Sequence, residues 1–233
     1  MITGPDNLFA LPELDAMLRE ELARLPQHAA RRPAGRALVL QPCASNGELA
    51  IDTRHLTAVR LHADHAQLRG DVFCGADALP WEDDAFQLIL AQHVVDVLPD
   101  AGLLMDELVR VLAPGGMLLC CGLNPWSPWL VWIHWRTRRG LPVPRATPAD
   151  VARMRLLKRG LTPARAEHLG SCWPQHGRTC AAARASLLDP LRGAWCIAAE
   201  KRRAVLTPLR PRMVRRQAPV QPHLVAPSRR ASA

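Results

Sequence analysis

The sequence lacks any long apolar run, although 48% of its 233 residues are hydrophobic. A helix that crosses a bilayer needs roughly 18 or more consecutive, mostly apolar residues, and no such stretch occurs. The N-terminus also lacks the basic start and apolar stretch that are typical of a secretory signal. We therefore expect no membrane span and a cytoplasmic protein, long enough for one domain with a real core.

Paired cysteine spacing is missing as well. The seven cysteines are an odd number, and none of them forms the CxxC pattern of a zinc knuckle. Cys172, His176 and Cys180 have the composition of a metal site but no obvious fourth ligand, so no metal is expected. In a chain without an export signal, the thiols are expected to stay reduced.

Lysine is almost absent, since only Lys158 and Lys201 occur among the 30 basic residues. The net charge of +9 comes from residues 201–233, which hold nine basic residues and no acidic one, so the rest of the chain balances 21 basic against 21 acidic residues. A neutral body argues against a nucleic-acid groove. The composition predicts that residues 206–233 form a basic, Pro/Arg-rich disordered tail. Weak contact of this tail with RNA or anionic lipid is the alternative.

Residues 79–125 carry the most informative pattern, which is a strand, a helix and a second strand. Residues 86–91 are apolar apart from Gln87, as expected for a strand that is buried on both faces. Asp100 is a plausible N-cap for a helix with apolar residues at helical spacing, and Pro114-Gly115-Gly116 ends that helix. Residues 117–121 then form a second buried strand. The unit is half of a parallel crossover, so the sequence predicts an α/β fold.

The rest of the chain shows shorter elements. Residues 11–25 form an amphipathic helix and 26–35 a linker, which gives an N-terminal helix and linker at 1–35 and a main domain at 36–205. The other predicted elements are strands at 36–40, 56–61 and 72–75, a helix at 148–160, and an antiparallel pair near 166–173 and 193–200. The connection before 72–75 is too short for a parallel crossover. It is therefore expected to be a loop or a single turn, and residues 47–55 only a stub of helix.

Two motifs resemble signatures of the class I S-adenosylmethionine-dependent methyltransferases of the type 11 family. One is Asp77-Ala78-Leu79-Pro80 followed by Trp81 and Phe86, and the other is Glu107-Leu-Val-Arg110-Val-Leu-Ala-Pro114-Gly-Gly116. Asn124-Pro125-Trp126-Ser127 further resembles the end of strand 5 in one bacterial subgroup. The resemblance covers about residues 36–212. It implies a Rossmann-like three-layer sandwich with a mostly parallel sheet and an antiparallel last strand. The short connections described above predict that helices A and B of this fold are shortened.

The glycine motif of that family is degenerate here. In the family, glycines after the first strand let the backbone approach the cofactor, and an acid precedes them. Leu40 replaces the acid, and Pro42, Ala44 and Asn46 replace the glycines. Proline cannot adopt positive φ and alanine does so only at a cost, although Gly47 could serve one position late. The resemblance assigns cofactor contacts to Cys43, Ala44, Ser45 and Gly47, and the alternative is a purely structural turn.

The resemblance also implies cofactor contacts after the other strands. Asp64 corresponds to the acid that binds the ribose hydroxyls, with His62 as a second option and an exposed turn aspartate as the alternative. Asp77 is expected to bind the adenine amino group and Ala78 to donate its backbone N–H nearby, unless they only cap a turn. Gln92 lies where the family lines the pocket floor. These contacts imply S-adenosylmethionine as the cofactor.

His93, Asn124 and Trp126 are the candidates on the substrate side. A histidine titrates near neutrality and could take a proton from a substrate, but methyl transfer often needs positioning alone, and His93 would then be a wall residue. Asn124 ends the fifth strand and could orient the substrate. Trp126 begins a series with Trp129, Trp132 and Trp135 that ends in arginines. The series indicates a core-facing helix, a wall for a flat or lipidic substrate, or an interfacial membrane anchor.

Two functions remain open at this point. The first is an enzyme that transfers a methyl group from S-adenosylmethionine to a small molecule, and we predict this one. The second is a catalytically degenerate relative that keeps the sheet as a binding or regulatory module, because the glycines are replaced. Neither the methyl acceptor nor the oligomeric state follows from the sequence.

Overall fold

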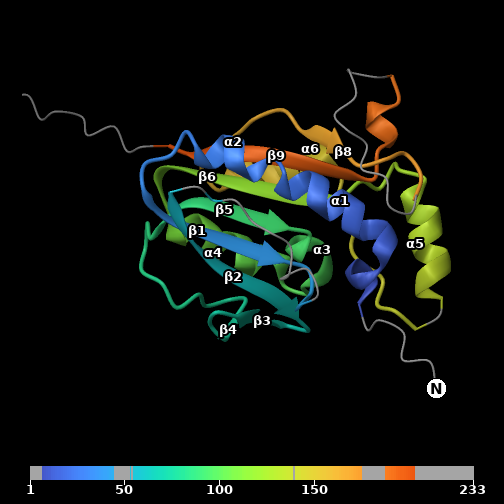
Figure 1. Cartoon of the computed structure of the whole chain (residues 1–233), viewed down its shortest axis with the longest axis horizontal. Helices are drawn as coiled ribbons and strands as arrows, with labels where there is room; N and C mark the ends of the chain where they lie inside the picture. Colours follow the sequence, from blue (N-terminus) through green and yellow to red (C-terminus); the bar gives the residue numbers. More distant parts are fainter. Residues whose placement is uncertain (1–6, 45–52, 54, 139, 175–186, 203–233) are drawn as a thin grey trace, which may run out of the picture. The chain divides into compact units, whose positions relative to one another are not determined.

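A computed structural model describes residues 7–44, 53, 55–138, 140–174 and 187–202 (Figure 1). The chain divides into two units, Met1–Arg203 and Ala204–Ala233. All elements described below belong to the first unit.

The described part of the first unit contains both helices and strands. The helices are η1 (Leu8–Ala10), α1 (Pro12–Leu22), α2 (Leu25–Ala29), α3 (Val94–Val97), α4 (Ala101–Val111), α5 (Trp129–Thr137), α6 (Ala149–Lys158) and η3 (Asp189–Leu191). The strands are β1 (Gly35–Gln41), β2 (Leu56–Asp64), β3 (Gln67–Gly70), β4 (Cys74–Gly75), β5 (Phe86–Gln92), β6 (Leu112–Leu123), β7 (Leu161–Pro163), β8 (Glu167–Leu169) and β9 (Ala194–Lys201).

The strands form a mixed sheet with the order β4-β3-β2-β1-β5-β6-β9-β7, and β8 also pairs with β9. The four central strands β2, β1, β5 and β6 run parallel, whereas β9 runs antiparallel to β6. The predicted α/β class, with a mostly parallel sheet and an antiparallel last strand, is confirmed. The order reverses at β1, since β2 lies on one side of it and β5 on the other.

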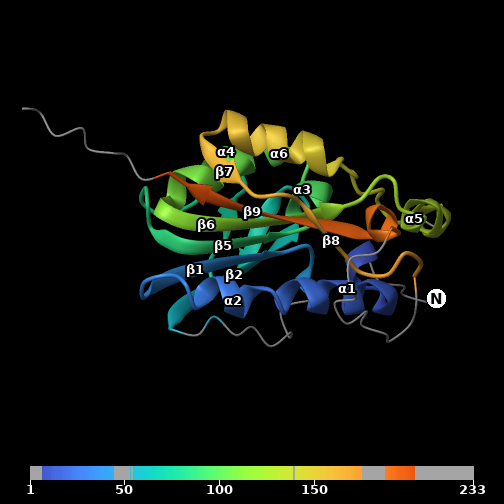
Figure 2. The same ribbon diagram turned by 90° about the horizontal axis from the view of Figure 1, so that it is seen from above.

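The side chains of the central strands alternate between two cores, one on each face of the sheet. In β1, Leu38 and Leu40 point into the core that α3, α4 and α6 cover, and Val39 points into the core that α1, α2 and α5 cover. Figure 2 shows α1 and α2 on one side of the sheet and α4 and α6 on the other. The predicted three layers are therefore present.

The connection after β2 differs from the prediction. Instead of a loop or a single turn, it contains β3, which pairs antiparallel with β2 through a tight turn at His65, where φ is 55°. The strand predicted at 72–75 is reduced to β4, which pairs with β3 rather than with β2. A hairpin needs only a few connecting residues, so it fits a segment that is too short for a parallel crossover. Part of the predicted linker at 26–35 is helical as well, in α2.

The two signature motifs hold each other in place. Arg110 of α4 donates to the backbone oxygens of Trp81 at 2.8 Å and Leu79 at 3.0 Å. Glu107 accepts from the backbone N–H of Leu79 at 2.8 Å and also binds Arg110. The family motifs thus attach α4 to the segment that leads into β5. The predicted helix after Asp100 is confirmed as α4, although the Asp100 side chain makes no capping bond.

Candidate cofactor and substrate pocket

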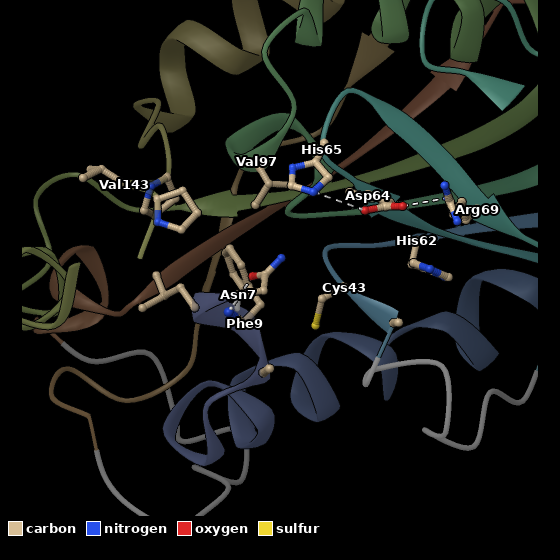
Figure 3. A pocket seen from close by; sticks show the side chains of 15 residues that line it. Asn7, Phe9, Cys43, His62, Asp64, His65, Arg69, Val97 and Val143 are labelled. Carbon is tan, nitrogen blue, oxygen red and sulfur yellow. Dashed lines mark hydrogen bonds and ion pairs between the residues drawn. The ribbon is translucent and has the colours of Figure 1, made fainter. Parts of the chain in front are cut away.

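A pocket of about 590 Å³ lies at the carboxyl ends of β1 and β2 (Figure 3). Its walls come from the loop after β1, the end of β2, η1, Val97 of α3 and the segment that follows α5. Open α/β sheets bind ligands at the carboxyl ends of the strands, where the strand order reverses. The volume lies in the range of small-molecule sites. The position and the size therefore suit a nucleotide-like ligand.

Asp64 supplies a carboxylate to this pocket, as the sequence predicted from the end of the second strand. Its Oδ2 accepts from Nε of Arg69 at 2.7 Å, while Nε2 of His65 lies 3.8 Å from Oδ1, beyond hydrogen-bond distance. The guanidinium of Arg69 also stacks over the ring of Phe73. A carboxylate has about four acceptor positions, so Asp64 keeps capacity for two neighbouring hydroxyls. Its role toward ribose stays a prediction.

The loop after β1 approaches the pocket without glycine. Cys43 and Ala44 line the pocket, and none of the described residues 41–44 has a positive φ. Nδ2 of Asn7, in the segment before η1, donates to the carbonyl oxygen of Pro42 at 3.0 Å and so stabilises the turn after β1. Proline and alanine therefore occupy former glycine positions without backbone strain. The predicted contacts Ser45 and Gly47, and most of the predicted helix stub at 47–55, lie outside the described residues.

Apolar side chains form the opposite wall of the pocket, which the sequence did not predict. They are Leu8 and Phe9 of η1, Val97 of α3, and Pro142, Val143 and Pro144 after α5. Oδ1 of Asn7 accepts from the backbone N–H of Phe9 at 2.9 Å and thereby caps η1. An asparagine before an apolar pair is a readable capping signal. The proline-rich segment gives no comparable signal, because only the tertiary structure brings it to the pocket.

Gln92 and His93 lie in the core, which corrects the expectation that they form the pocket floor. Nε2 of Gln92 donates to the carbonyl oxygen of Leu18 and to Oε2 of Glu21, both at 2.8 Å. Nε2 and Nδ1 of His93 each lie 2.9 Å from a carboxylate oxygen, of Glu21 and Asp96 respectively, and the ring is fully buried. With both nitrogens engaged, His93 has none left for a substrate proton.

The surroundings of His93 favour its charged form. Burial alone would lower the pKa of His93, but the negative charge of Glu21 and the hydrogen bonds to Asp96 and Glu21 raise it to about 10. Burial raises the pKa of Asp96, and the hydrogen bond from His93 opposes this. Oδ2 of Asp96 also accepts from the backbone N–H of Leu123 at 2.8 Å. The cluster therefore joins α1 to the ends of β5 and β6.

This cluster also supports the pocket wall, because the ring of Phe9 lies 4.8 Å from the ring of His93. Glu21 was missed in the sequence, although a signal exists. It lies on the same helical face as Leu14, Leu18 and Leu25 of the predicted amphipathic helix. A carboxylate in such a stripe is expected to have a partner, since an unpaired buried charge is costly.

Asp77 and Ala78 do not line the pocket. Both are exposed, and an isolated antiparallel bridge between Gly75 and Ala78 closes the turn that holds them. This geometry agrees with the alternative of a turn, while the adenine contact stays a prediction.

Asn124 is buried and points to the backbone of a neighbouring turn rather than to the pocket. Its Nδ2 donates to the carbonyl oxygens of Pro190 at 2.7 Å and Arg192 at 2.9 Å, and its Oδ1 accepts from the backbone N–H of Trp126 at 3.1 Å. Trp126 itself is exposed and lies on a separate groove along α5. The two predicted substrate residues are therefore not brought to the pocket.

The described residues form neither a membrane-spanning helix nor a metal-binding cluster. No helix in the part of the chain that the structure describes is long and apolar enough to cross a membrane. Across the described ranges, no group of three or more histidine, cysteine, aspartate or glutamate side chains is arranged to hold a metal ion. His176 and Cys180 of the sequence pattern fall outside these ranges.

Part of the chain is similar to known methyltransferases. Residues 34–120 match a family model described as a methyltransferase domain. A ubiquinone biosynthesis O-methyltransferase from Nitrobacter winogradskyi is 32% identical over 94 residues, which is 39% of this chain and 36% of the relative. The chain thus aligns with little more than a third of the length of that curated relative.

Solved structures share the fold at low sequence identity. A S-adenosylmethionine-dependent methyltransferase from Archaeoglobus fulgidus has a TM-score of 0.54 at 14% identity, covering 77% of this chain and 92% of that chain. A possible histamine N-methyltransferase from Thermotoga maritima has a TM-score of 0.53 at 15% identity, covering 83% and 93%. The described residues therefore have the Rossmann-like fold of the class I methyltransferases, and residues 34–120 match the methyltransferase domain.

Proposed function

We propose that this chain is a S-adenosylmethionine-dependent methyltransferase that acts on a small molecule. The observation that carries the proposal is the pocket at the carboxyl ends of β1 and β2, with Asp64 at the end of β2. The family match over residues 34–120 supports it, because this range contains both strands and Asp64. The cofactor would bind between the β1 loop and Asp64, and the methyl acceptor against the apolar wall.

The residues of the pocket suit the cofactor in two respects. The carboxylate of Asp64, held by Arg69, can accept hydrogen bonds from two ribose hydroxyls. Residues 41–44 approach the pocket with ordinary backbone angles, so the loss of glycine leaves the turn intact. When bound, S-adenosylmethionine supplies a methyl group on a positively charged sulfur. The chain itself positions the acceptor and excludes water, which can suffice for methyl transfer.

The apolar wall favours an acceptor with an apolar body. Phe9, Val97 and residues 142–144 line the pocket with mostly apolar side chains, on the side opposite the β1 loop. The Nitrobacter winogradskyi relative is named as an O-methyltransferase of ubiquinone biosynthesis. We therefore propose a hydroxyl group on a flat apolar molecule as the acceptor for this chain too.

Calorimetry with S-adenosylmethionine tests the proposal. We expect micromolar binding that weakens about tenfold or more in Asp64→Asn, because this change removes a charge-assisted acceptor. The matched control is Asp15→Asn, since Asp15 also forms an exposed ion pair with an arginine, at 2.8 Å, but lies on α1 away from the pocket. The control should bind like the wild type.

One result would reject the enzyme. If the folded protein does not bind S-adenosylmethionine even at millimolar concentration, the pocket belongs to a degenerate relative that only binds or regulates. If both variants bind S-adenosylmethionine as tightly as the wild type, the protein still binds the cofactor, but Asp64 does not contact it.

A further inference from the structure

The outer face of α5 exposes large apolar side chains. Trp126 is 73% exposed, Val131 69% and Trp135 52%. Together with Pro128, His134 and Arg138 they line a groove of about 730 Å³. Val131 and Trp135 are four residues apart, as are His134 and Arg138, so the groove follows one side of the helix. In Figure 1 this helix lies at one end of the described unit, beyond the sheet.

The helix is apolar on its other side as well. Trp129 and Ile133 are buried in the core that α1 and α2 share, and Nε1 of Trp129 donates to the carbonyl oxygen of Ser171 at 2.8 Å. Core packing therefore explains only half of the tryptophan series. The helix therefore has large apolar side chains on two opposite sides, one in the core and one exposed, and an exposed apolar patch of this kind marks an interaction surface.

The described residues that line the groove include the basic side chains His134 and Arg138 and no acidic one. No acidic residue occurs in the sequence between Glu107 and Asp150, while residues 123–149 contain four arginines. Arg138 lines the groove itself, whereas Arg136 of the same helix forms an ion pair with Glu13 of α1 at 3.0 Å. Asp189 of the neighbouring η3 is neutralised by an ion pair with Arg192 at 2.8 Å. An occupant of the groove is therefore expected to carry negative charge beside apolar surface.

We propose that the outer face of α5 binds the surface of a bilayer that contains anionic phospholipid. Tryptophan rings suit the boundary between headgroups and acyl chains, and arginine is attracted to anionic headgroups. With nine residues, α5 is too short to span a membrane, so it lies in the interface. A second copy of the chain fits less well, because a two-fold contact would bring Arg138 against a groove that offers it no carboxylate among its lining residues.

Such docking would place the pocket near the lipid. Pro142, Val143 and Pro144, which form part of the apolar pocket wall, follow the end of α5 at Thr137 by only a few residues in the sequence. A membrane-bound α5 would therefore hold this wall beside the bilayer. The proposal itself stands on the groove alone and does not depend on methyl transfer.

Co-sedimentation of the full chain with vesicles tests the proposal. We expect binding to phosphatidylcholine vesicles that contain phosphatidylglycerol and much less to pure phosphatidylcholine. The double variant Trp126→Ser/Trp135→Ser should bind the mixed vesicles about tenfold more weakly, and Arg138→Glu should weaken binding as well. The controls are Met154→Ser/Leu157→Ser and Arg153→Glu on α6, whose side chains are also exposed. They should bind like the wild type.

Two outcomes would overturn the proposal. In the first, the double tryptophan variant binds the mixed vesicles as well as the wild type. The nine basic residues at 201–233 would then account for the attraction to anionic lipid. Alternatively, sedimentation velocity could show a dimer that the tryptophan variant dissociates, together with no vesicle binding. The groove would then belong to a second copy of the chain.

Discussion

The ring of His93 lies between the carboxylates of Glu21 and Asp96, and all three side chains are fully buried. Breaking such a cluster by removing one partner leaves a buried charge unpaired, which costs about 3–5 kcal/mol. The cluster is also the place where the N-terminal helix α1 is bound to the ends of β5 and β6 by polar contacts. Its protonation is therefore expected to affect the stability of the fold.

The raised pKa of His93 predicts that stability falls with rising pH. The pKa is about 10 in the folded protein and about 6.5 in the unfolded chain. The stabilisation is therefore complete below about pH 6.5 and is lost as the pH rises toward 10. Urea unfolding between pH 6.5 and 8, below the range in which unfolded cysteines titrate, should show the free energy of unfolding falling by up to about 1.4 kcal/mol per pH unit.

Two variants distinguish the contribution of His93 to this pH dependence from that of other titrating groups. Glu21→Gln removes the largest attraction for the proton, so the fall in the free energy of unfolding should become shallower. His28→Gln on α2 should keep the wild-type slope, since burial lowers the pKa of His28 rather than raising it. A wild-type stability that stays flat across this pH range would show that His93 is not charged in the folded protein.

At the scale of elements, β6 and β9 pack closely because Gly122 leaves room for an indole ring. A Cβ at Gly122 would overlap the side chain of Trp195. Trp195 is fully buried, and its Nε1 donates to the carbonyl oxygens of Leu123 at 3.2 Å and Thr147 at 2.8 Å. The indole thus ties the antiparallel last strand to the parallel part of the sheet.

Gly122→Ala is predicted to destabilise the protein by about 1–3 kcal/mol, because the extra methyl group has to displace Trp195. Gly102→Ala is the matched control. Gly102 lies in α4, where a Cβ would meet only the end of the Arg159 side chain at 4.0 Å, so the change to alanine should stabilise the helix by about 0.5–1 kcal/mol. Urea midpoints at an unchanged m-value measure both effects. Equal effects of the two changes would contradict the close packing at Gly122.

The strands and helices were largely predictable, because local pattern decides them. β1, β5 and α4 follow from buried runs and helical spacing in the sequence, and the structure confirms them. The hairpin of β2 and β3 was not predicted. Its turn requires a positive φ at His65, and a histidine gives no strong turn signal of the kind that Asn-Gly gives.

At the scale of the whole molecule, the site was only partly predictable. Asp64, Cys43 and Ala44 come together because Asp64 ends β2 and the other two follow β1, and the carboxyl ends of parallel strands share one edge of the sheet. Phe9 and Pro142 reach the same pocket from distant parts of the chain, which no local pattern encodes. His93 was misplaced for the same reason, since its partner Glu21 lies 72 residues away in sequence.

The N-terminal helices share one core with the sheet. Leu14, Leu18 and Leu25 are fully buried and belong to the same cluster as Val39 of β1 and Leu90 of β5. The domain boundary expected at residue 35 would divide this cluster. Full burial of one such side chain contributes about 1.5–3 kcal/mol, and a whole domain is stable by only about 5–15 kcal/mol.

Removal of residues 1–30 is therefore predicted to abolish cooperative folding. The shortened chain should show no sharp thermal transition and should bind a dye for exposed apolar surface. The matched control ends the chain after Arg203, the last residue of the first unit, and should keep the midpoint of the full-length protein. If the chain without residues 1–30 unfolds cooperatively near the wild-type midpoint, α1 and α2 are an accessory layer, and the sheet with its other helices is the independently stable part.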